Sequence, residues 1–212
     1  MRSVRTGWVL GALLLVSAQA SRAGTGAPAL HSKSPARITL VGSTAGVPDA
    51  IGTFTVTAID LANNPMRNVS VIIDLSGCPD VAICADPLDA AAMVNCVAKM
   101  VRKFTDSAGN VSFTVLGAGS GTGDFIALPH SAKIYVNGSL IGSPTAAVLD
   151  LDGMNGVGIN DLAVWLQDFG ADPPRGRSDF DGDGVVDIND LSVWIQAFGA
   201  HGSLQGCAAR CP

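Results

Sequence analysis

The chain has 212 residues, enough for one or two domains. It carries 13 basic residues against 18 acidic ones, all of them aspartate, which argues against a nucleic-acid-binding protein. With 48% hydrophobic residues, 15% charged residues and 25 glycines, it is too hydrophobic for wholesale disorder and too rich in turn residues for a helical bundle, so we expect a mainly β body.

Residues 1–23 have the pattern of a secretory signal peptide. Basic residues precede an apolar run from Trp8 to Val16, and small residues follow, so that signal peptidase would cleave after Ala20 or Ala23. The run is too short for a comfortable transmembrane helix of about 20 residues, and no later stretch is apolar for long enough. We therefore expect a mature protein that is secreted or displayed at the cell surface and has no membrane span.

Between residues 36 and 149, short β-type runs alternate with turn signals. Phe54, Val56 and Ala58 alternate with threonines, which is the period of a half-buried strand, and sequences such as Asn63-Asn64-Pro65 separate the runs. Seven strands over about 115 residues fit two packed antiparallel sheets. The strands are expected at 37–41, 52–59, 69–75, 99–105, 111–116, 133–136 and 146–149.

The order of these turns resembles bacterial immunoglobulin-like domains of the invasin and adhesin kind. In the resemblance, a strand that ends in Asp-x-x-x-Asn-Pro (60–65) leads into VSVIIDLSG (69–77), and TDSAGNVSFTV (105–115) forms a later hairpin. The similarity covers roughly half of the chain. It implies an immunoglobulin-like antiparallel β-sandwich.

Five cysteines lie in the part expected to be exported, where disulfides persist. The spacing of Cys207 and Cys211 permits a small terminal ring, while Cys78, Cys84 and Cys96 can supply one pair and leave one thiol free or bonded to another chain. The sequence does not determine the connectivity. A zinc site is disfavoured, because there is no Cys-x-x-Cys pair and the three histidines are scattered.

Two segments of the β region invite a functional interpretation. Residues 78–96 are expected to form a helical or irregular excursion, and a disulfide-stapled loop that caps the sandwich is favoured over a functional loop. The glycine-rich run 117–123 lacks the Gly-Lys-Ser/Thr ending of a phosphate-binding loop and does not open a helix. A flexible hairpin loop is the favoured interpretation of that run.

An internal repeat begins at Asp150. A shift of 29 residues lays DLDGMNGVGINDLAVWLQDFGA (150–171) on DFDGDGVVDINDLSVWIQAFGA (179–200) without a gap. Aspartates, glycines, a tryptophan and a phenylalanine recur at equivalent positions. The segment therefore contains a duplicated unit.

The second copy has the spacing of a calcium-binding loop. Aspartates occupy its first, third, fifth and twelfth positions, and Gly184 permits the sharp turn. Calcium takes six to eight oxygen ligands, and five acids within twelve residues repel one another unless a cation neutralises them. Val185 would contribute its backbone carbonyl, and Asp187 would act directly or through a water. The ligands expected here are Asp179, Asp181, Asp183, Val185, Asp187 and Asp190.

The first copy has fewer acidic ligands. Met154 occupies the fifth position, Gly158 the ninth, and Asn155 takes the place of the turn glycine. The loss of two carboxylates should weaken calcium binding by orders of magnitude, so the occupancy of this loop stays open. The ligands expected here are Asp150, Asp152, Gly156 and Asp161.

Each loop is followed by a predicted helix with one apolar face, because leucine or isoleucine, tryptophan and phenylalanine recur at i, i+3, i+4 and i+7. We expect these faces to pack together as a core and Val164 and Val193 to remain available to a partner. Gly170 and Gly199 should end the helices. The helices are expected at 160–169 and 189–198, with apolar positions at Leu162, Trp165, Leu166 and Phe169 and at Leu191, Trp194, Ile195 and Phe198.

No helix precedes either loop, since strand and turn residues come before the first and Pro173-Pro174 before the second. Two loop-helix units without entering helices, each with aspartate and then leucine at the end of the loop, resemble a type I dockerin domain over residues 150–200. The resemblance implies calcium-dependent docking to a cohesin-bearing scaffold, with the ligand positions given above. The cohesin-recognising pair, often Ser-Thr in that family, is here Ile159-Asn160 and Ile188-Asn189, a departure from its pattern.

The sequence thus predicts a mainly β protein with an immunoglobulin-like β-sandwich (36–149), a small α-helical dockerin-like module (150–200) and a C-terminal tail (201–212). No hydrolase motif is present, and the aspartates outside the loops fall at strand ends or turns, so we expect no enzymatic activity.

We expect an exported calcium-binding protein with a structural, adhesive or interaction-mediating role, whose partner is a cohesin-bearing scaffold or surface protein. The alternative is a cohesin-docking accessory component of extracellular polysaccharide degradation, with a sandwich that binds glycan. An exposed aromatic row would favour the alternative. The aromatic residues available to the sandwich are Phe54, Phe104, Phe113, Phe125 and Tyr135.

Overall fold

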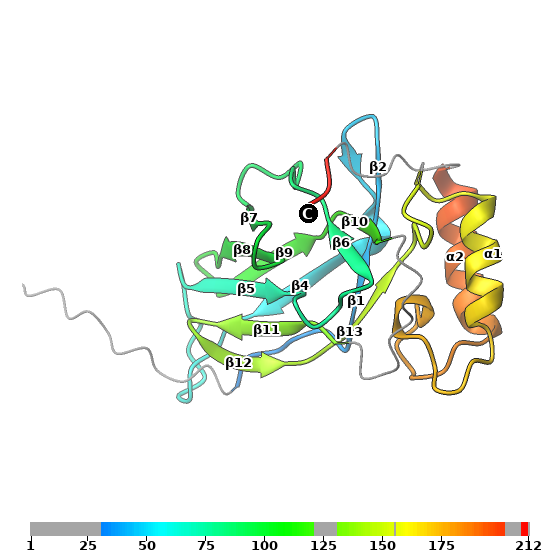
Figure 1. The fold of residues 1–212 in the computed structure, drawn as a ribbon. Helices are drawn as coiled ribbons and strands as arrows, with labels where there is room; N and C mark the ends of the chain where they lie inside the picture. Colours follow the sequence, from blue (N-terminus) through cyan, green and yellow to red (C-terminus); the bar gives the residue numbers. More distant parts are fainter. Residues whose placement is uncertain (1–30, 121–130, 155, 202–208, 212) are drawn as a thin grey trace, which may run out of the picture.

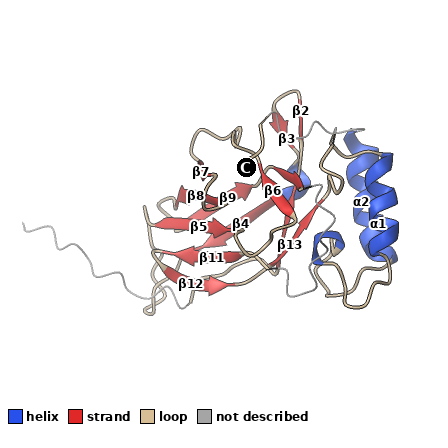
Figure 2. Cartoon of the chain, in the orientation of Figure 1, coloured by secondary structure: helices blue, strands red, loops and turns tan. Residues whose placement is uncertain are grey.

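The computed structural model describes residues 31–120, 131–154, 156–201 and 209–211. The expected signal peptide lies outside this part of the chain. The described chain is mainly β, with its strands first and two α-helices after them (Figures 1 and 2). Figure 1 places the two helices at one end of the strands.

The largest sheet has five antiparallel strands in the order β12-β11-β5-β8-β7. In the central strand, Val71 and Ile73 are fully buried while Ile72 between them is only half-buried, because side chains alternate between the two faces. The strands of this sheet are β5 (Ser70–Asp74), β7 (Met93–Asn95), β8 (Met100–Phe104), β11 (Lys133–Val136) and β12 (Ser139–Gly142).

The other strands of the described chain form two-stranded pairs. β4 pairs antiparallel with β9, and β1 pairs parallel with β13. β10 pairs with β6, and β2 pairs with β3. Their bounds are β1 (Arg37–Leu40), β2 (Ser43–Thr44), β3 (Val47–Pro48), β4 (Thr53–Thr57), β6 (Val81–Ile83), β9 (Asn110–Thr114), β10 (Gly117–Gly119) and β13 (Thr145–Val148).

One hydrophobic core holds the inward side chains of the five-stranded sheet and of the β4–β9 pair. Val56 and Val111 from the pair meet Ile73 and Ile134 from the sheet in this core. Each of these side chains is at most 5% exposed. The seven predicted strands coincide with β1, β4, β5, β8, β9, β11 and β13, whereas the remaining strands have only two to four residues, too few to show a period.

Residues 78–96 are irregular between β6 and β7, as expected, but we did not expect the two strands themselves. The segment contains β6, which is wholly buried, and β7, which extends the five-stranded sheet. The start of the glycine-rich run, expected to be a flexible hairpin loop, is the buried strand β10, and residues 121–123 lie outside the described chain. Gly119 is required in β10, because a Cβ there would collide with the carbonyl oxygen of Leu151.

The two predicted helices are present as α1 (Ile159–Asp168) and α2 (Ile188–His201). Gly170 has a φ of +65° just after α1, as expected for a left-handed C-cap. Gly199 does not end α2, which continues to His201; an interior glycine costs a helix only about 1 kcal/mol. Neither described helix is long and apolar enough to cross a membrane. Two 3-10 helices are η1 (Ala50–Gly52) and η2 (Gly176–Ser178).

The predicted apolar face of each helix is only partly buried. Trp165 and Trp194 are 2% exposed and join the core of the β part. Leu162 and Leu191 are half-buried against the same core. The other members of the two faces are exposed at the surface, namely Leu166, Phe169, Ile195 and Phe198.

Val164 and Val193, which we expected to face a partner, are instead packed against the core. The expectation was wrong because the two helices pack on the core of the β part. As a result, the buried face of α1 includes Asp161 and Asp168 as well as Trp165. Helical periodicity identifies which residues share a face but not which neighbouring element covers it.

The cysteine pairing differs from both pairs that the spacing permitted. Cys211 is bonded to Cys96 and therefore forms no terminal ring with Cys207. Cys84 is also disulfide-bonded, and Cys78 is a buried free thiol, so the cluster of three supplies no pair of its own. The sequence could not show this pairing, because it depends on tertiary structure. The C-terminal residues pair with the backbone beside β6, and this pairing brings Cys211 back to the β part.

Candidate metal sites

The second loop brings its first three expected ligands together. Carboxylate oxygens of Asp179, Asp181 and Asp183 lie within 4.8 Å of one another. Asp181 accepts a hydrogen bond from the backbone N–H of Asp183 (3.1 Å), and Asp183 accepts one from Val185 (2.8 Å). These local turns let alternating aspartates converge, as the spacing predicted.

Asp190, the twelfth residue of this loop, closes it. The side chain is fully buried in the first turn of α2. Its two oxygens accept hydrogen bonds from the backbone N–H groups of Asp181 (3.0 Å) and Asp187 (2.8 Å). The twelfth-position carboxylate is thereby fixed next to the third position, while Asp187 accepts a hydrogen bond from Asn189 (2.7 Å).

Gly184 makes the sharp turn that the sequence predicted, with a φ of +89°. Its N–H and that of Gly182 donate to the carboxylate of Asp179, at 3.1 and 2.7 Å. Burial raises the pKa of Asp179, and the negative charges of Asp190 and Asp181 add to this effect, while the two N–H groups oppose it. Burial also raises the pKa of Asp190. The loop thus places the negative charges of Asp179 and Asp190 in a buried environment.

The first loop repeats this arrangement. Carboxylate oxygens of Asp150, Asp152 and Asp161 lie within 4.8 Å of one another. Asp161 accepts hydrogen bonds from the backbone N–H groups of Asp152 (2.9 Å) and Gly158 (2.6 Å), as Asp190 does from the equivalent residues of the second loop. The duplicated sequence is therefore a duplicated structure at the closing carboxylate.

Asp150 differs from its counterpart in that neither carboxylate oxygen accepts a hydrogen bond of normal geometry from the described residues, although the nearby N–H of Gly153 lowers its pKa somewhat. The side chain is fully buried, and neither carboxylate oxygen is satisfied within the described chain. Burial raises its pKa to about 7, and the charges of Asp161 and Asp152 add to the rise, while Arg210 opposes it. Burial likewise raises the pKa of Asp161 to about 6. An unpaired buried carboxylate is costly, so this loop has the chemistry of a site that requires a cation.

The first loop lacks carboxylate ligands at the positions that the sequence predicted. Met154, at the fifth position, is 61% exposed, and only its backbone N–H contacts the loop, donating to Asp152 at 2.7 Å. Gly156 is buried with a φ of +76°, at the place expected to offer a carbonyl. Asn155 lies outside the described chain. The first loop therefore offers three carboxylates where the second offers five.

Residues far away in the sequence hold both loops, and sequence reasoning missed them. Arg37 of β1 donates a hydrogen bond to the carbonyl oxygen of Phe180. Arg210 donates one to the carbonyl oxygen of Gly119 (3.2 Å), and the N–H of Gly119 donates to the carbonyl oxygen of Asp150 (2.6 Å). Isolated arginines outside the repeat gave no sequence signal.

A buried ion pair connects α1 to the linker between the two copies. Arg177 donates to both oxygens of Asp168, from Nε at 2.8 Å and from the terminal nitrogen at 3.1 Å. The hydroxyl of Ser178 donates to the same carboxylate at 2.6 Å. Because this carboxylate is fully paired, Asp168 is a structural residue and not a further metal ligand.

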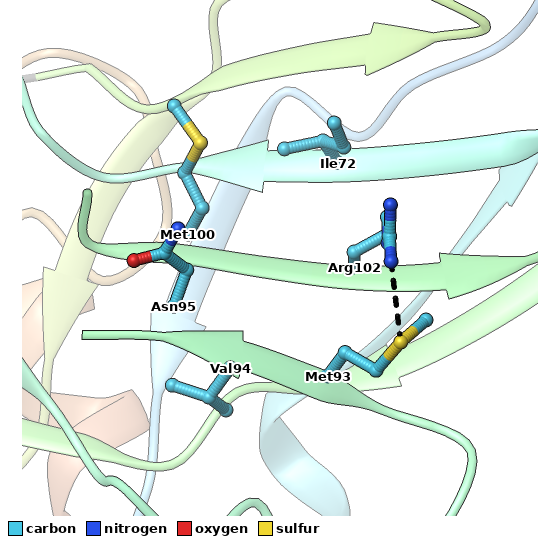
Figure 3. Close-up of a pocket in the computed structure, with 6 residues that line it drawn as sticks. All are labelled: Ile72, Met93, Val94, Asn95, Met100 and Arg102. Carbon is cyan, nitrogen blue, oxygen red and sulfur yellow. Dashed lines mark hydrogen bonds between the residues drawn. The ribbon is translucent and has the colours of Figure 1, made fainter. Parts of the chain in front are cut away.

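The β part has a shallow apolar pocket of about 290 Å³ on the five-stranded sheet, drawn in Figure 3. Arg102 contacts the sulfur of Met93 at 3.3 Å, and its guanidinium also lies over the Phe104 ring, 5.5 Å from the centroid. No carboxylate, thiol or imidazole lines this pocket among the described residues, so it offers no acid–base pair. Its lining residues are Ile72, Met93, Val94, Asn95, Met100 and Arg102.

Comparison with known proteins adds no assignment. No protein-family model matches the chain, and neither a curated protein nor a solved structure is significantly similar to it. The function must therefore be inferred from the geometry of the two loops.

Proposed function

We propose that this chain is an exported calcium-binding protein without catalytic activity, in which an immunoglobulin-like β-sandwich carries a dockerin-like interaction module. The observation that carries the proposal is the carboxylate of Asp150, which is fully buried, accepts no hydrogen bond of normal geometry from the described residues and lies beside two further carboxylates. Such a group is stable as an anion only when a cation neutralises it.

The donor set favours calcium over other metals. The side chains that gather in the two loops, among the described residues, are carboxylates, and hard oxygen ligands of this kind suit calcium, magnesium or manganese, not zinc or copper. Magnesium demands near-ideal octahedral geometry and dehydrates reluctantly, whereas calcium accepts irregular, flexible shells. When bound, calcium supplies the positive charge that lets the carboxylates approach. Its ligands would be Asp179, Asp181, Asp183, Val185, Asp187 and Asp190 in the second loop and Asp150, Asp152, Gly156 and Asp161 in the first.

The surface of the helices supports an interaction role. Apolar side chains are exposed at equivalent positions of the two copies, which are related by the 29-residue shift of the repeat. Contiguous exposed apolar patches mark interaction sites, and these are the positions that such a patch on the two helices would use. A partner that docks through these pairs would contact Ile159 and Ile188, Leu166 and Ile195, and Phe169 and Phe198, each between 36% and 68% exposed.

The aromatic residues favour a structural or adhesive role for the β part over glycan binding. Phe113 is buried and stacks on Phe54, with ring centroids 5.6 Å apart. Phe104 is 46% exposed, Tyr135 is half-buried, and Phe125 lies outside the described chain. Phe104 alone is a poor platform for a sugar ring, because the guanidinium of Arg102 already lies over its ring.

The proposal is tested by calcium titration of the mature chain, residues 24–212, with its disulfides intact. Trp8 is lost with the expected signal peptide, so Trp165 and Trp194 are then the sole tryptophans and their fluorescence reports on the two helices. We expect heat of binding by calorimetry and a shift in tryptophan emission when calcium is added to chelator-treated protein. Magnesium at the same concentration should give a much smaller response.

The matched variants remove one carboxylate from each loop. Asp161→Asn together with Asp190→Asn should abolish both the heat and the fluorescence change, whereas Asp172→Asn, an exposed aspartate between the two copies, should leave them intact. A wild-type chain that neither binds calcium nor changes its fluorescence would contradict the proposal.

A further inference from the structure

The C-terminal residues are fixed against the β part by backbone pairing and by a disulfide. The N–H of Cys211 donates to the carbonyl oxygen of Ile83, and the N–H of Ala85 donates to that of Ala209, both at 2.8 Å. Cys211 is bonded to Cys96. The residue between these anchors is Arg210, which is therefore held in one place although it lies near the end of the chain.

The side chain of Arg210 reaches the first loop. Its terminal nitrogen donates to the carbonyl oxygen of Gly119, the residue whose N–H donates to the backbone of Asp150. The same nitrogen lies over Gly153, the fourth residue of the loop, because a Cβ built there would come within 2.6 Å of it. The guanidinium thus sits directly on the backbone that carries Asp150 and Asp152.

The second loop has an arginine at the equivalent glycine, but with a different part of the side chain. Carbon atoms of Arg37 lie over Gly182, with its Cβ and Cδ 3.0 and 3.3 Å from a Cβ built on the glycine. At the glycine itself a charged nitrogen faces the first loop and a hydrocarbon stem faces the second, although a terminal nitrogen of Arg37 donates to the carbonyl oxygen of Phe180 in the second loop. Each loop therefore has an arginine close to its backbone, and the arginine of the first loop places its guanidinium over the glycine.

We propose that Arg210 is a built-in counter-ion of the first loop, which competes with calcium for the field of Asp150, Asp152 and Asp161 and lowers the calcium affinity of this loop. The inference rests on the proposed function. A fixed positive charge near a site repels a divalent cation, and where solvent screens the pair we expect one unit charge to change affinity by about tenfold.

The experiment is calcium calorimetry on the mature chain with intact disulfides, comparing the wild type with Arg210→Gln and Arg210→Lys. Asp152→Asn identifies the binding event that belongs to the first loop, because that event disappears. Arg67→Gln is the matched control: it changes the net charge equally but lies exposed in the connection from β4 to β5.

We expect Arg210→Gln to tighten the first-loop event by about tenfold, and Arg210→Lys and Arg67→Gln to keep it within about twofold of the wild type. An unchanged or weakened event in Arg210→Gln would overturn the proposal and leave Arg210 a purely structural anchor. Equal tightening in Arg67→Gln would also overturn it, since net charge alone would then be responsible. A wild-type chain without any calcium binding would instead overturn the proposed function itself.

Discussion

Arg37, at the start of β1, donates a hydrogen bond to the carbonyl oxygen of Phe180, which lies 143 residues later in the second loop. Phe180 is fully buried in the core that the helices share with the β part. Arg37 and Asp181 also line one pocket of about 450 Å³ at this junction. The second loop is therefore built onto the β part, so that ordering of the loop should stabilise both.

Arg37→Ala should lower the free energy of unfolding by about 1–2 kcal/mol, because a charged donor to a buried carbonyl is lost. The calcium affinity of the second loop responds to two opposed effects, because the loop loses an attachment and also a nearby positive charge, and its direction of change shows which effect is larger. Urea unfolding followed by tryptophan fluorescence measures the change in stability and calorimetry the change in affinity. Arg67→Ala, an exposed arginine, is the control and should change neither; equal behaviour of the two variants would show that the contact contributes nothing.

The strands of four or five residues were largely predictable, and the alternation of side chains is clearest in β4. The partners of those strands were not, because pairing joins residues far apart in the chain, such as Arg37 of β1 and Thr145 of β13. The glycines of β10 illustrate a second limit. In a sequence they indicate a flexible turn, whereas here Gly119 allows two backbones to approach closely.

The buried ion pair of Asp168 and Arg177 gives a prediction about stability. Their side chains are 1% and 6% exposed, so Asp168→Ala leaves a buried guanidinium without this carboxylate and should cost about 3–5 kcal/mol. The comparison is Asp89→Ala, which removes the partly exposed ion pair with Lys103 (2.7 Å) and should cost less than about 1 kcal/mol. Urea unfolding of both variants measures the two costs. Similar losses of unfolding free energy would mean that burial does not strengthen the Asp168–Arg177 pair.

The metal-site candidates were predictable from one sequence because their ligands are local. Both loops place acids at fixed offsets, and the structure brings three of them together in each loop. What surrounds the loops was not predictable. Asp168 resembled any surface acid of a helix, and Arg210 any residue of a C-terminal tail, since burial and ion pairing depend on which elements pack nearby.

The raised pKa of Asp150 predicts that the metal-free protein becomes more stable against urea as the pH falls. Its pKa is about 7 in the folded chain against 3.8 ordinarily, so between these values the folded state binds more protons than the unfolded state. The contribution is fully present below about pH 4 and is lost as pH rises through 7. In chelator, the tryptophan-detected urea midpoint should therefore rise from pH 8 to pH 5.

Asp150→Asn provides the control for this pH dependence, because it removes one titrating carboxylate and should weaken the dependence, leaving the contribution of Asp161, whose pKa burial raises to about 6. With saturating calcium the wild-type profile should reverse, since protons then compete with the metal for the same carboxylates. A metal-free midpoint that falls on mild acidification would contradict the assignment of a buried, unpaired carboxylate.

The last prediction separates the two loops by mutation. The second loop has carboxylates at its fifth and ninth positions, Asp183 and Asp187, where the first has Met154 and Gly158, so we expect the second loop to bind calcium more tightly. Asp181→Ala should therefore abolish the tighter event in calorimetry. Asp152→Ala should remove a weaker event and leave the tighter one in place.

The same variants should differ in their effect on the helices. Trp165 and Trp194 belong to one core, so loss of the tight site, by Asp181→Ala or by Asp190→Ala, should also loosen α1 and diminish the calcium-induced change in tryptophan emission. Asp152→Ala should diminish it less, because α2 stays anchored by the filled second loop. Two equal, high-affinity events in the wild type would contradict the asymmetry, and would mean that the unpaired carboxylate of Asp150 compensates for the acids that the first loop lacks.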